Sequence, residues 1–238
     1  TLQEILMQWD EFSEWGAKIS RWAADYHTTL RERPVRAQTE PGDVAALIAP
    51  SAPEGPHAMT EIMEDFERVV MPGITHWQHP RFFAYFPANA APPSMLAEML
   101  VSTIAAQCML WQTSPAATEM ETIMLDWLRQ AVGLPNNFSG VIQDSASSAT
   151  LVAVLTMRER ALKWSGNQAG LSGAARLRIY CSEEVHTSVD RAIWVAGIGQ
   201  ENLVRIPISG KLRSMNPKLL KEAIQSDMAA GHCPAGIV

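Results

Sequence analysis

Apolar residues recur every three to four positions over four stretches in the first part of the chain, the spacing that gathers side chains on one face of an α-helix. The stretches cover residues 2–26, 59–70, 93–109 and 114–132. Ser114 is an N-cap type of residue followed by proline, which favours the start of a helix at that point. The pattern therefore predicts four helices before residue 133.

Beyond residue 140, short apolar runs alternate with further helical patterns. The runs predict strands at 141–142, 177–181, 203–208 and 235–238, and the helical patterns between them cover 146–162, 186–197 and 216–230. Strands that alternate with helices indicate an α/β fold with a largely parallel sheet. Ligands bind such sheets at the carboxyl ends of the strands.

Two features near the N-terminus leave alternatives open. The helix over 2–26 carries Trp9, Trp15 and Trp22 on its apolar stripe. Such a stripe needs a large apolar surface to cover it, either in its own domain or on a partner subunit. Residues 75–93 are dense in aromatic side chains and have no helical or strand period. This segment is either a loop that forms a binding site or a packed connector.

Small hydroxyl residues stand where the apolar run 141–142 leads into the helix over 146–162. The first N–H groups of a helix have no partner within it, and the helix dipole is positive at that end. With the hydroxyls of Ser145 and Ser147, this turn suits a phosphate group. The alternative is a serine-rich helix cap without a ligand. Neither a Gly-Lys-Ser/Thr sequence nor a Gly-x-Gly-x-x-Gly pattern accompanies the turn, so a small phosphorylated cofactor fits better than a nucleotide.

His186 follows the predicted strand 177–181 and should lie at the same edge of the sheet as that turn. Its ring is either a polar surface group at a helix start, or a group that stacks on a cofactor and acts on protons. The other histidines lack metal-binding spacing, since His76 and His79 lie in an irregular stretch that no cysteine or carboxylate joins. We expect no metal site.

The composition narrows the class of protein. The chain has 238 residues, of which 47% are hydrophobic and 18% charged, as in globular proteins. A net charge of −6 leaves no basic surplus for nucleic acid. No apolar run reaches the roughly 18 residues of a membrane helix. Three scattered cysteines form neither a disulfide framework nor a zinc pattern, and they indicate a reducing, cytoplasmic location.

Four motifs stand in the order and spacing of one enzyme family. They are HPRFFAYFP at 79–87, SPAATEME at 114–121, VIQDSAS at 141–147 and HTSVDRA at 186–192. In these motifs the chain resembles the group II pyridoxal-phosphate-dependent amino-acid decarboxylases, and most of all the aromatic-L-amino-acid (dopa and tryptophan) decarboxylases. The resemblance covers essentially the whole chain.

The resemblance implies a fold, a cofactor and an assembly. The fold would be the α/β, type I aminotransferase-like fold, preceded by an N-terminal helical segment. Residues 1–84 would be the segment that embraces a partner in an obligate homodimer, and residues 85–238 the first part of the large cofactor-binding domain. The cofactor would be pyridoxal 5'-phosphate, and the reaction would convert an aromatic L-amino acid into its amine and CO2.

The resemblance also implies roles for single residues. Ala146 and Ser147, with Ser145 beside them, would bind the cofactor phosphate. His186 would stack on the pyridine ring and contact the substrate, which makes it the candidate catalytic residue. The substrate pocket at the dimer interface would be lined by Trp77, Tyr85, Phe86, Pro87 and Ala88, with Gln107 and Met109 supplied to the other subunit's site. Animal members of the family usually have Thr at the position of Ala88 and Phe at that of Met109, so these two positions bear on substrate choice.

Pyridoxal chemistry needs a lysine that bonds the cofactor and a carboxylate that keeps its pyridine nitrogen protonated. In this family the lysine stands in a His-Lys pair. None of the five lysines of the chain does, and these are Lys18, Lys163, Lys211, Lys218 and Lys221. The family's later aspartate is missing as well, and the sequence stops within the predicted strand at 235–238. We therefore expect the chain to correspond to the N-terminal half of a longer polypeptide, with the lysine on the remainder or on a second chain.

Two other functions stay open. One is decarboxylation of another amino acid, glutamate or histidine, whose pocket would need a cation or a polar group, and only Arg81 and Gln107 stand near the aromatic segment. The other is a non-catalytic phosphate-binding or interaction module.

Overall fold

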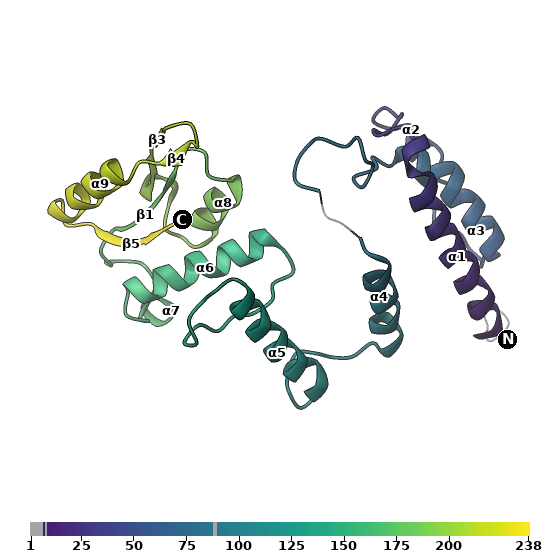
Figure 1. Cartoon of the computed structure of the whole chain (residues 1–238), viewed down its shortest axis with the longest axis horizontal. Coiled ribbons are helices and arrows are strands. Elements are labelled where there is room, and N and C mark those ends of the chain that lie inside the picture. Colours follow the sequence, from purple (N-terminus) through teal and green to yellow (C-terminus); the bar gives the residue numbers. More distant parts are fainter. Residues whose placement is uncertain (1–6, 8, 88–89) are drawn as a thin grey trace. The chain divides into compact units, whose positions relative to one another are not determined.

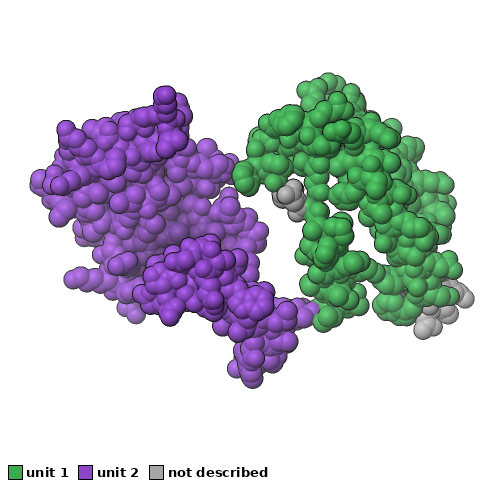
Figure 2. Space-filling view, viewed as in Figure 1, with its two compact units in different colours: residues 1–105 green, residues 106–238 purple. Residues whose placement is uncertain are grey.

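The computed structural model describes residues 7, 9–87 and 90–238, which form two compact units. The N-terminal unit comprises residues 1–105 and the C-terminal unit residues 106–238; Figure 2 colours them separately. The domain boundary that we predicted after residue 84 falls inside the N-terminal unit and stays a prediction.

Helices make up the regular structure of the N-terminal unit in its described residues. Its elements are α1 (Trp9–Thr29), η2 (Leu30–Glu32), α2 (Asp43–Ala46), α3 (Met59–Asp65), η3 (Phe66–Val70), η4 (Met71–Gly73) and α4 (Pro92–Ile104). The predicted helices over 2–26, 59–70 and 93–109 are thus present with shifted ends, and residues 2–6 and 8 lie outside the described part. The third helix stops before 109 because Ala105 adopts a left-handed conformation, with φ of 48°.

One end of α1 packs within its own unit. Trp22 stacks on Tyr26, with ring centroids 5.4 Å apart, and meets the edge of Phe66 at 5.3 Å. The Trp22 indole N–H also donates a hydrogen bond to the Glu67 carboxylate. The other end of the stripe is open, because Trp9 is 83% exposed. Around Trp22 the apolar stripe of α1 is therefore covered by its own domain, which was the first of our two alternatives.

The C-terminal unit is an α/β structure around a parallel sheet. Its elements are α5 (Pro115–Ala131), α6 (Ala146–Ala161), α7 (Gly166–Ala169), β1 (Leu177–Ser182), α8 (Thr187–Val195), η5 (Gln200–Asn202), β2 (Leu203–Ile206), β3 (Ile208–Ser209), β4 (Ser214–Met215), α9 (Pro217–Ala229) and β5 (Cys233–Ile237). Strand β1 is central, with β2 and β5 parallel on either side, while β3 and β4 form a separate antiparallel pair. This confirms the predicted fold class.

Two predicted strands need correction. Residues 141–142 are irregular, with Val141 58% and Ile142 57% exposed. A strand forms only where another strand receives its hydrogen bonds, and the Ile142 N–H instead donates to the Glu121 carboxylate on α5, at 3.1 Å. The strand predicted over 203–208 ends at Ile206 because Pro207 has no N–H to donate, and Ile208 pairs with β4.

The core lies between β1 and the helices on its two faces. Side chains alternate along a strand, so Ile179 packs among Val154 of α6 and Ile193 of α8, all three fully buried. Tyr180 points the other way, and its hydroxyl donates to Asp227 of α9 at 2.8 Å. Figure 1 shows α6 and α9 on opposite sides of β5.

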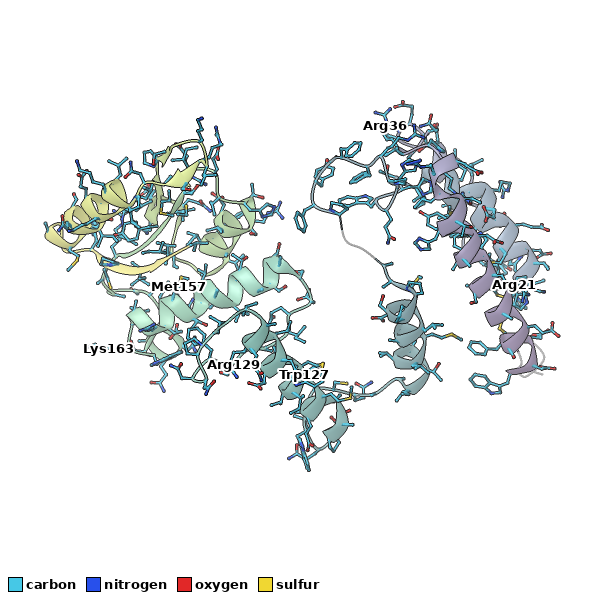
Figure 3. All side chains as sticks on the ribbon, viewed as in Figure 1. Arg21, Arg36, Trp127, Arg129, Met157 and Lys163 are labelled. Carbon is cyan, nitrogen blue, oxygen red and sulfur yellow. The ribbon has the colours of Figure 1, made fainter. Side chains whose placement is uncertain are left out.

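Strand β5 approaches α6 closely at a glycine. A Cβ added to Gly236 would meet the side chain of Met157, whose Cγ lies 2.8 Å away. Figure 3 shows Met157 on the side of α6 that faces β5. A residue without a side chain therefore lets the strand pack directly on the helix.

Candidate functional site: two helix N-termini beside a parallel sheet

Helix α6 begins at the serine-rich turn as predicted. Ser145 is its N-cap, with extended backbone, and its Oγ accepts a hydrogen bond from the Ser148 N–H at 3.2 Å. The Ser148 hydroxyl lies 3.1 Å from the same oxygen. This cap satisfies one of the unpaired N–H groups of the first turn and fixes the point at which the helix starts.

The N–H groups of Ala146 and Ser147 remain available. Within the described residues, no acceptor is bonded to either amide or to the Ser147 hydroxyl, and both residues are exposed. Two free amides, a free hydroxyl and the positive end of a 16-residue helix make a site for an anion. A phosphate monoester fits this set of donors, which come from the residues predicted to bind one.

His186 caps the neighbouring helix. It precedes α8 with extended backbone, and its Nδ1 accepts from the Ser188 N–H at 3.2 Å, with the Ser188 hydroxyl 3.0 Å away. Because Nδ1 accepts from a backbone amide, the neutral ring carries its proton on Nε2. The residue is exposed whereas Ser188 is buried, so the contact fixes the ring and leaves its far side open.

Helices α6 and α8 place these two caps at one edge of the C-terminal unit. Figure 1 shows the helices side by side, and near their other ends the Arg158 guanidinium donates to the Ala196 carbonyl at 2.9 Å. His186 follows the carboxyl end of β1, as predicted, which is the usual ligand-binding edge of a parallel sheet.

The predicted substrate-binding residues divide between the two units. In the N-terminal unit Trp77 stacks with both Phe82 and Tyr85, whose ring centroids lie 5.1 and 5.4 Å from that of Trp77. Tyr85 and Phe86 are 86% and 96% exposed, and Tyr85 has a φ of 57°. A positive φ is uncommon outside glycine and marks a constrained loop.

The remaining predicted pocket residues are also at the surface or outside the described part. Pro87 is exposed, and Ala88 lies outside the described residues. In the C-terminal unit Gln107 is exposed and Met109 is 74% exposed. The Gln107 carbonyl accepts from the Thr113 hydroxyl at 2.6 Å, which closes a turn before α5. The structure therefore positions the aromatic residues within the N-terminal unit, and Gln107 and Met109 within the C-terminal unit.

Sequence reasoning missed the residues that hold the turn before His186. Glu183 and Glu184 bond to the segment 208–213, which folds back on this turn. A sequence signal existed in the two adjacent carboxylates directly after a buried strand, but their partners lie more than twenty positions away.

Two kinds of feature are absent from the described part of the chain. No group of three or more histidine, cysteine or acidic residues there could hold a metal ion. None of its helices is both long and apolar enough to cross a membrane.

The sequence of the chain matches a family model and several known enzymes. Residues 41–238 match the model of the pyridoxal-dependent decarboxylase conserved domain. The chain is 40% identical to aromatic-L-amino-acid decarboxylase of Rattus norvegicus, over 96% of this chain and 49% of that protein. It is 36% identical to tryptophan decarboxylase 2 of Oryza sativa, over 96% of this chain and 46% of that protein.

A solved structure shows the same fold. The crystal structure of Catharanthus roseus tryptophan decarboxylase in complex with L-tryptophan superimposes with a TM-score of 0.89 and 32% identity, over 97% of this chain and 49% of that one. The chain thus spans about half the length of the proteins that it matches. By the family model and by its relatives, the chain belongs to the pyridoxal-dependent decarboxylase family.

Proposed function

We propose that the protein binds pyridoxal 5'-phosphate and decarboxylates an aromatic L-amino acid to the corresponding amine and CO2. The observation that carries this proposal is the start of α6, where two amides and a hydroxyl without a partner among the described residues suit a phosphate group. The aromatic substrate class is supported by relatives whose names are aromatic-L-amino-acid, tryptophan and tyrosine decarboxylase.

The residues at the start of α6 anchor the cofactor. The N–H groups of Ala146 and Ser147 and the Ser147 hydroxyl would donate to phosphate oxygens, while Ser145 holds the turn in shape through its bond to Ser148. Charge-assisted hydrogen bonds of this kind are stronger than neutral ones. The helix dipole adds attraction for the dianion.

His186 supports the other end of the cofactor. Bound pyridoxal phosphate supplies an electron sink for the pair of electrons left when CO2 departs. The imidazole of His186 would stack on the pyridine ring, and its Nε2–H, which the contact with Ser188 leaves free, could hold a proton for the reaction.

The aromatic segment forms the substrate pocket. We assign the substrate's ring to a surface lined by Trp77, Tyr85, Phe86, Pro87 and Ala88. Gln107 and Met109 complete the pocket of the second subunit in a homodimer. The stacking of Trp77 on Tyr85 supports this assignment, since two rings held in parallel present a flat apolar surface.

The organisation that we propose is a dimer-embracing segment over residues 1–84 and a cofactor-binding domain that starts at residue 85. We assign none of the five lysines to cofactor attachment, because none has the family's His-Lys context. We propose a cytoplasmic location, which the free thiols of Cys108, Cys181 and Cys233 support.

Neither alternative function is supported by a specific observation. A glutamate or histidine decarboxylase would need a free cation or polar group at the aromatic segment, but Arg81 donates within its own unit to the Arg31 carbonyl, at 3.4 Å. A phosphate-binding module without catalysis would not account for relatives that are named as decarboxylases and match over 96% of this chain.

Cofactor binding and turnover test the proposal together. The protein is expressed from its complete open reading frame and mixed with pyridoxal phosphate and L-tryptophan or L-dopa. We expect a visible absorption band that borohydride removes, and release of CO2 from the amino acid. A protein that shows the band but releases CO2 only from glutamate would refute the substrate class. A protein without the band would refute the cofactor assignment.

A further inference from the structure

The hairpin formed by β3 and β4 holds the turn that carries His186. This turn, Glu183–His186, connects β1 to α8. The Ile208 N–H at the start of β3 donates to the Glu183 carboxylate at 3.1 Å. Arg213, just before β4, donates its Nε–H to Glu184 at 2.9 Å and pairs with the second oxygen of the same carboxylate through Nη2. Two adjacent side chains of the turn are therefore bonded to one hairpin, Glu183 to the first residue of β3 and Glu184 to the residue that precedes β4.

The turn is also fixed through its backbone N–H groups. The Glu183 N–H donates to the Ile206 carbonyl at 3.1 Å, and the Glu184 and Val185 N–H groups donate to Ser182 at 3.0 and 3.1 Å. These bonds determine the path of the backbone, whereas the Glu184 side chain is held by its bond with Arg213. The bidentate geometry of that pair restricts orientation more than a single hydrogen bond would.

The hairpin itself is constrained at Arg213. This residue has a φ of 50°, which a non-glycine residue rarely adopts, and its N–H donates to the Gly210 carbonyl at 3.2 Å. The tight turn brings the guanidinium to Glu184, although the Arg213 side chain remains largely exposed. Leu212, the preceding residue, is 89% exposed and takes no part in the contact.

We propose that Glu184 and Arg213 are positioning residues that hold His186 ready for the cofactor ring before the cofactor binds. This inference rests on the proposed function of the site. The ring of His186 is exposed and bonds only to Ser188 among the described residues, so its place depends on the backbone of the turn. Ordering the turn in advance removes an entropic cost that binding would otherwise bear.

The contribution of the Glu184–Arg213 pair to cofactor binding depends on how exposed the two side chains are. The side chains of Glu184 and Arg213 are 40% and 66% exposed, so solvent and salt weaken their attraction. Exposed ion pairs contribute about 0.2–1 kcal/mol, which corresponds to a change of up to roughly fivefold in a binding constant. Salt at about 1 M shortens the screening length to about 3 Å and should remove most of this difference.

A charge swap tests the ion pair of Glu184 and Arg213, which we call the clamp. The variants Arg213→Ala, Glu184→Ala and the double variant Glu184→Arg with Arg213→Glu are titrated with pyridoxal phosphate, with Leu212→Ala as the control on the same hairpin. We expect each single variant to weaken cofactor binding roughly two- to fivefold at low salt, and the swapped variant to recover most of the loss. The control should match the wild type. Hydrogen exchange at residues 183–188, measured without cofactor, should be faster in both single variants.

The outcomes separate this inference from the function on which it rests. If the wild type binds the cofactor and the single variants bind equally well, with unchanged exchange at 183–188, the clamp is refuted and the function stands. A loss that the swap does not recover and that high salt does not reduce would refute the electrostatic clamp as well. If the wild type binds no cofactor, the proposed function fails, and the role assigned to Glu184 and Arg213 fails with it.

Discussion

The two units differ in what their apolar residues contact. In the C-terminal unit Val154, Ile179 and Ile193 are fully buried around the parallel sheet. In the N-terminal unit α1, α3 and α4 contribute no buried residue, and the buried positions include the polar His76 and His79. The C-terminal unit closes a core around its sheet, whereas the N-terminal unit leaves α4 and the Trp9 end of α1 exposed.

Helix α4 shows the difference most clearly. Leu96, Leu100 and Ile104 recur every fourth position and are 60%, 63% and 71% exposed. Exposed apolar faces are typical of surfaces that other protein covers, and the homodimer that we propose would cover this one. We therefore expect substitutions in the C-terminal unit to act on folding and those on α4 to act on assembly.

The largest expected effect is a cavity in the core of the C-terminal unit. Ile193→Ala removes a side chain that is 0% exposed. The free energy of unfolding should fall by about 2–5 kcal/mol, because the neighbouring side chains cannot refill the space. Urea unfolding followed by circular dichroism measures the change. Leu212→Ala, at an exposed site, should shift it by less than about 0.5 kcal/mol. Equal effects of the two variants would contradict a packed core here.

The next effect concerns α4. Leu100→Ala should leave the secondary structure intact and weaken self-association by about 1.5–3 kcal/mol, the cost of losing a buried leucine from an interface. Sedimentation equilibrium at several protein concentrations measures the dimer dissociation constant. Glu98→Ala on the same helix is the control. A dimer that is unaffected by Leu100→Ala would show that α4 lies outside the interface.

A smaller loss of stability is expected at Gly236. Gly236→Ala would place a methyl group against Met157, so the strand or the methionine must shift, at a cost of about 1–3 kcal/mol. Thermal unfolding should occur at a lower temperature. Gly55→Ala, where nothing lies within 4 Å of the added carbon, is the matched control and should behave as the wild type. Unchanged stability of the Gly236 variant would mean that Met157 moves aside freely.

A further substitution acts on binding rather than on folding. Ser147→Ala removes a hydroxyl from the proposed phosphate site, and cofactor affinity should fall by about 1 kcal/mol, roughly fivefold. Thr150→Ala is the control, since that hydroxyl donates within α6 to the Ala146 carbonyl at 2.8 Å. Isothermal titration with pyridoxal phosphate measures both. An unchanged affinity of the Ser147 variant would remove its hydroxyl from the site.

The smallest effect is a pH dependence in the N-terminal unit. Burial, with Arg33 and His79 nearby, lowers the pKa of His76 below its usual value, and the ring contacts the Tyr26 hydroxyl at 2.8 Å. The unfolded chain then takes up this proton first, near pH 6.5. The contribution of His76 to stability is therefore complete above that pH and declines as the pH falls below it. Urea unfolding between pH 7.5 and 5.5 should show this decline, and His76→Asn should reduce it.

The parts that could be predicted from the sequence are those set by local signals. The start of α6 follows from Ser145 and the helical pattern after it, and the place of His186 at the start of α8 follows from its position after a buried strand, whereas its role as the cap does not. The strand predicted over 141–142 was wrong because a strand depends on a neighbour that no local pattern reveals. The bond between Glu184 and Arg213 joins residues 29 positions apart, and only the folded hairpin brings them together.

The most direct test of the central claim compares the cofactor with and without its phosphate. Equilibrium dialysis of the protein against pyridoxal phosphate and against pyridoxal isolates what the start of α6 contributes. The account predicts that the phosphate form binds at least about tenfold more tightly, and that Ser147→Ala narrows the difference. Equal binding of the two compounds would contradict the assignment of Ala146 and Ser147 as the phosphate anchor.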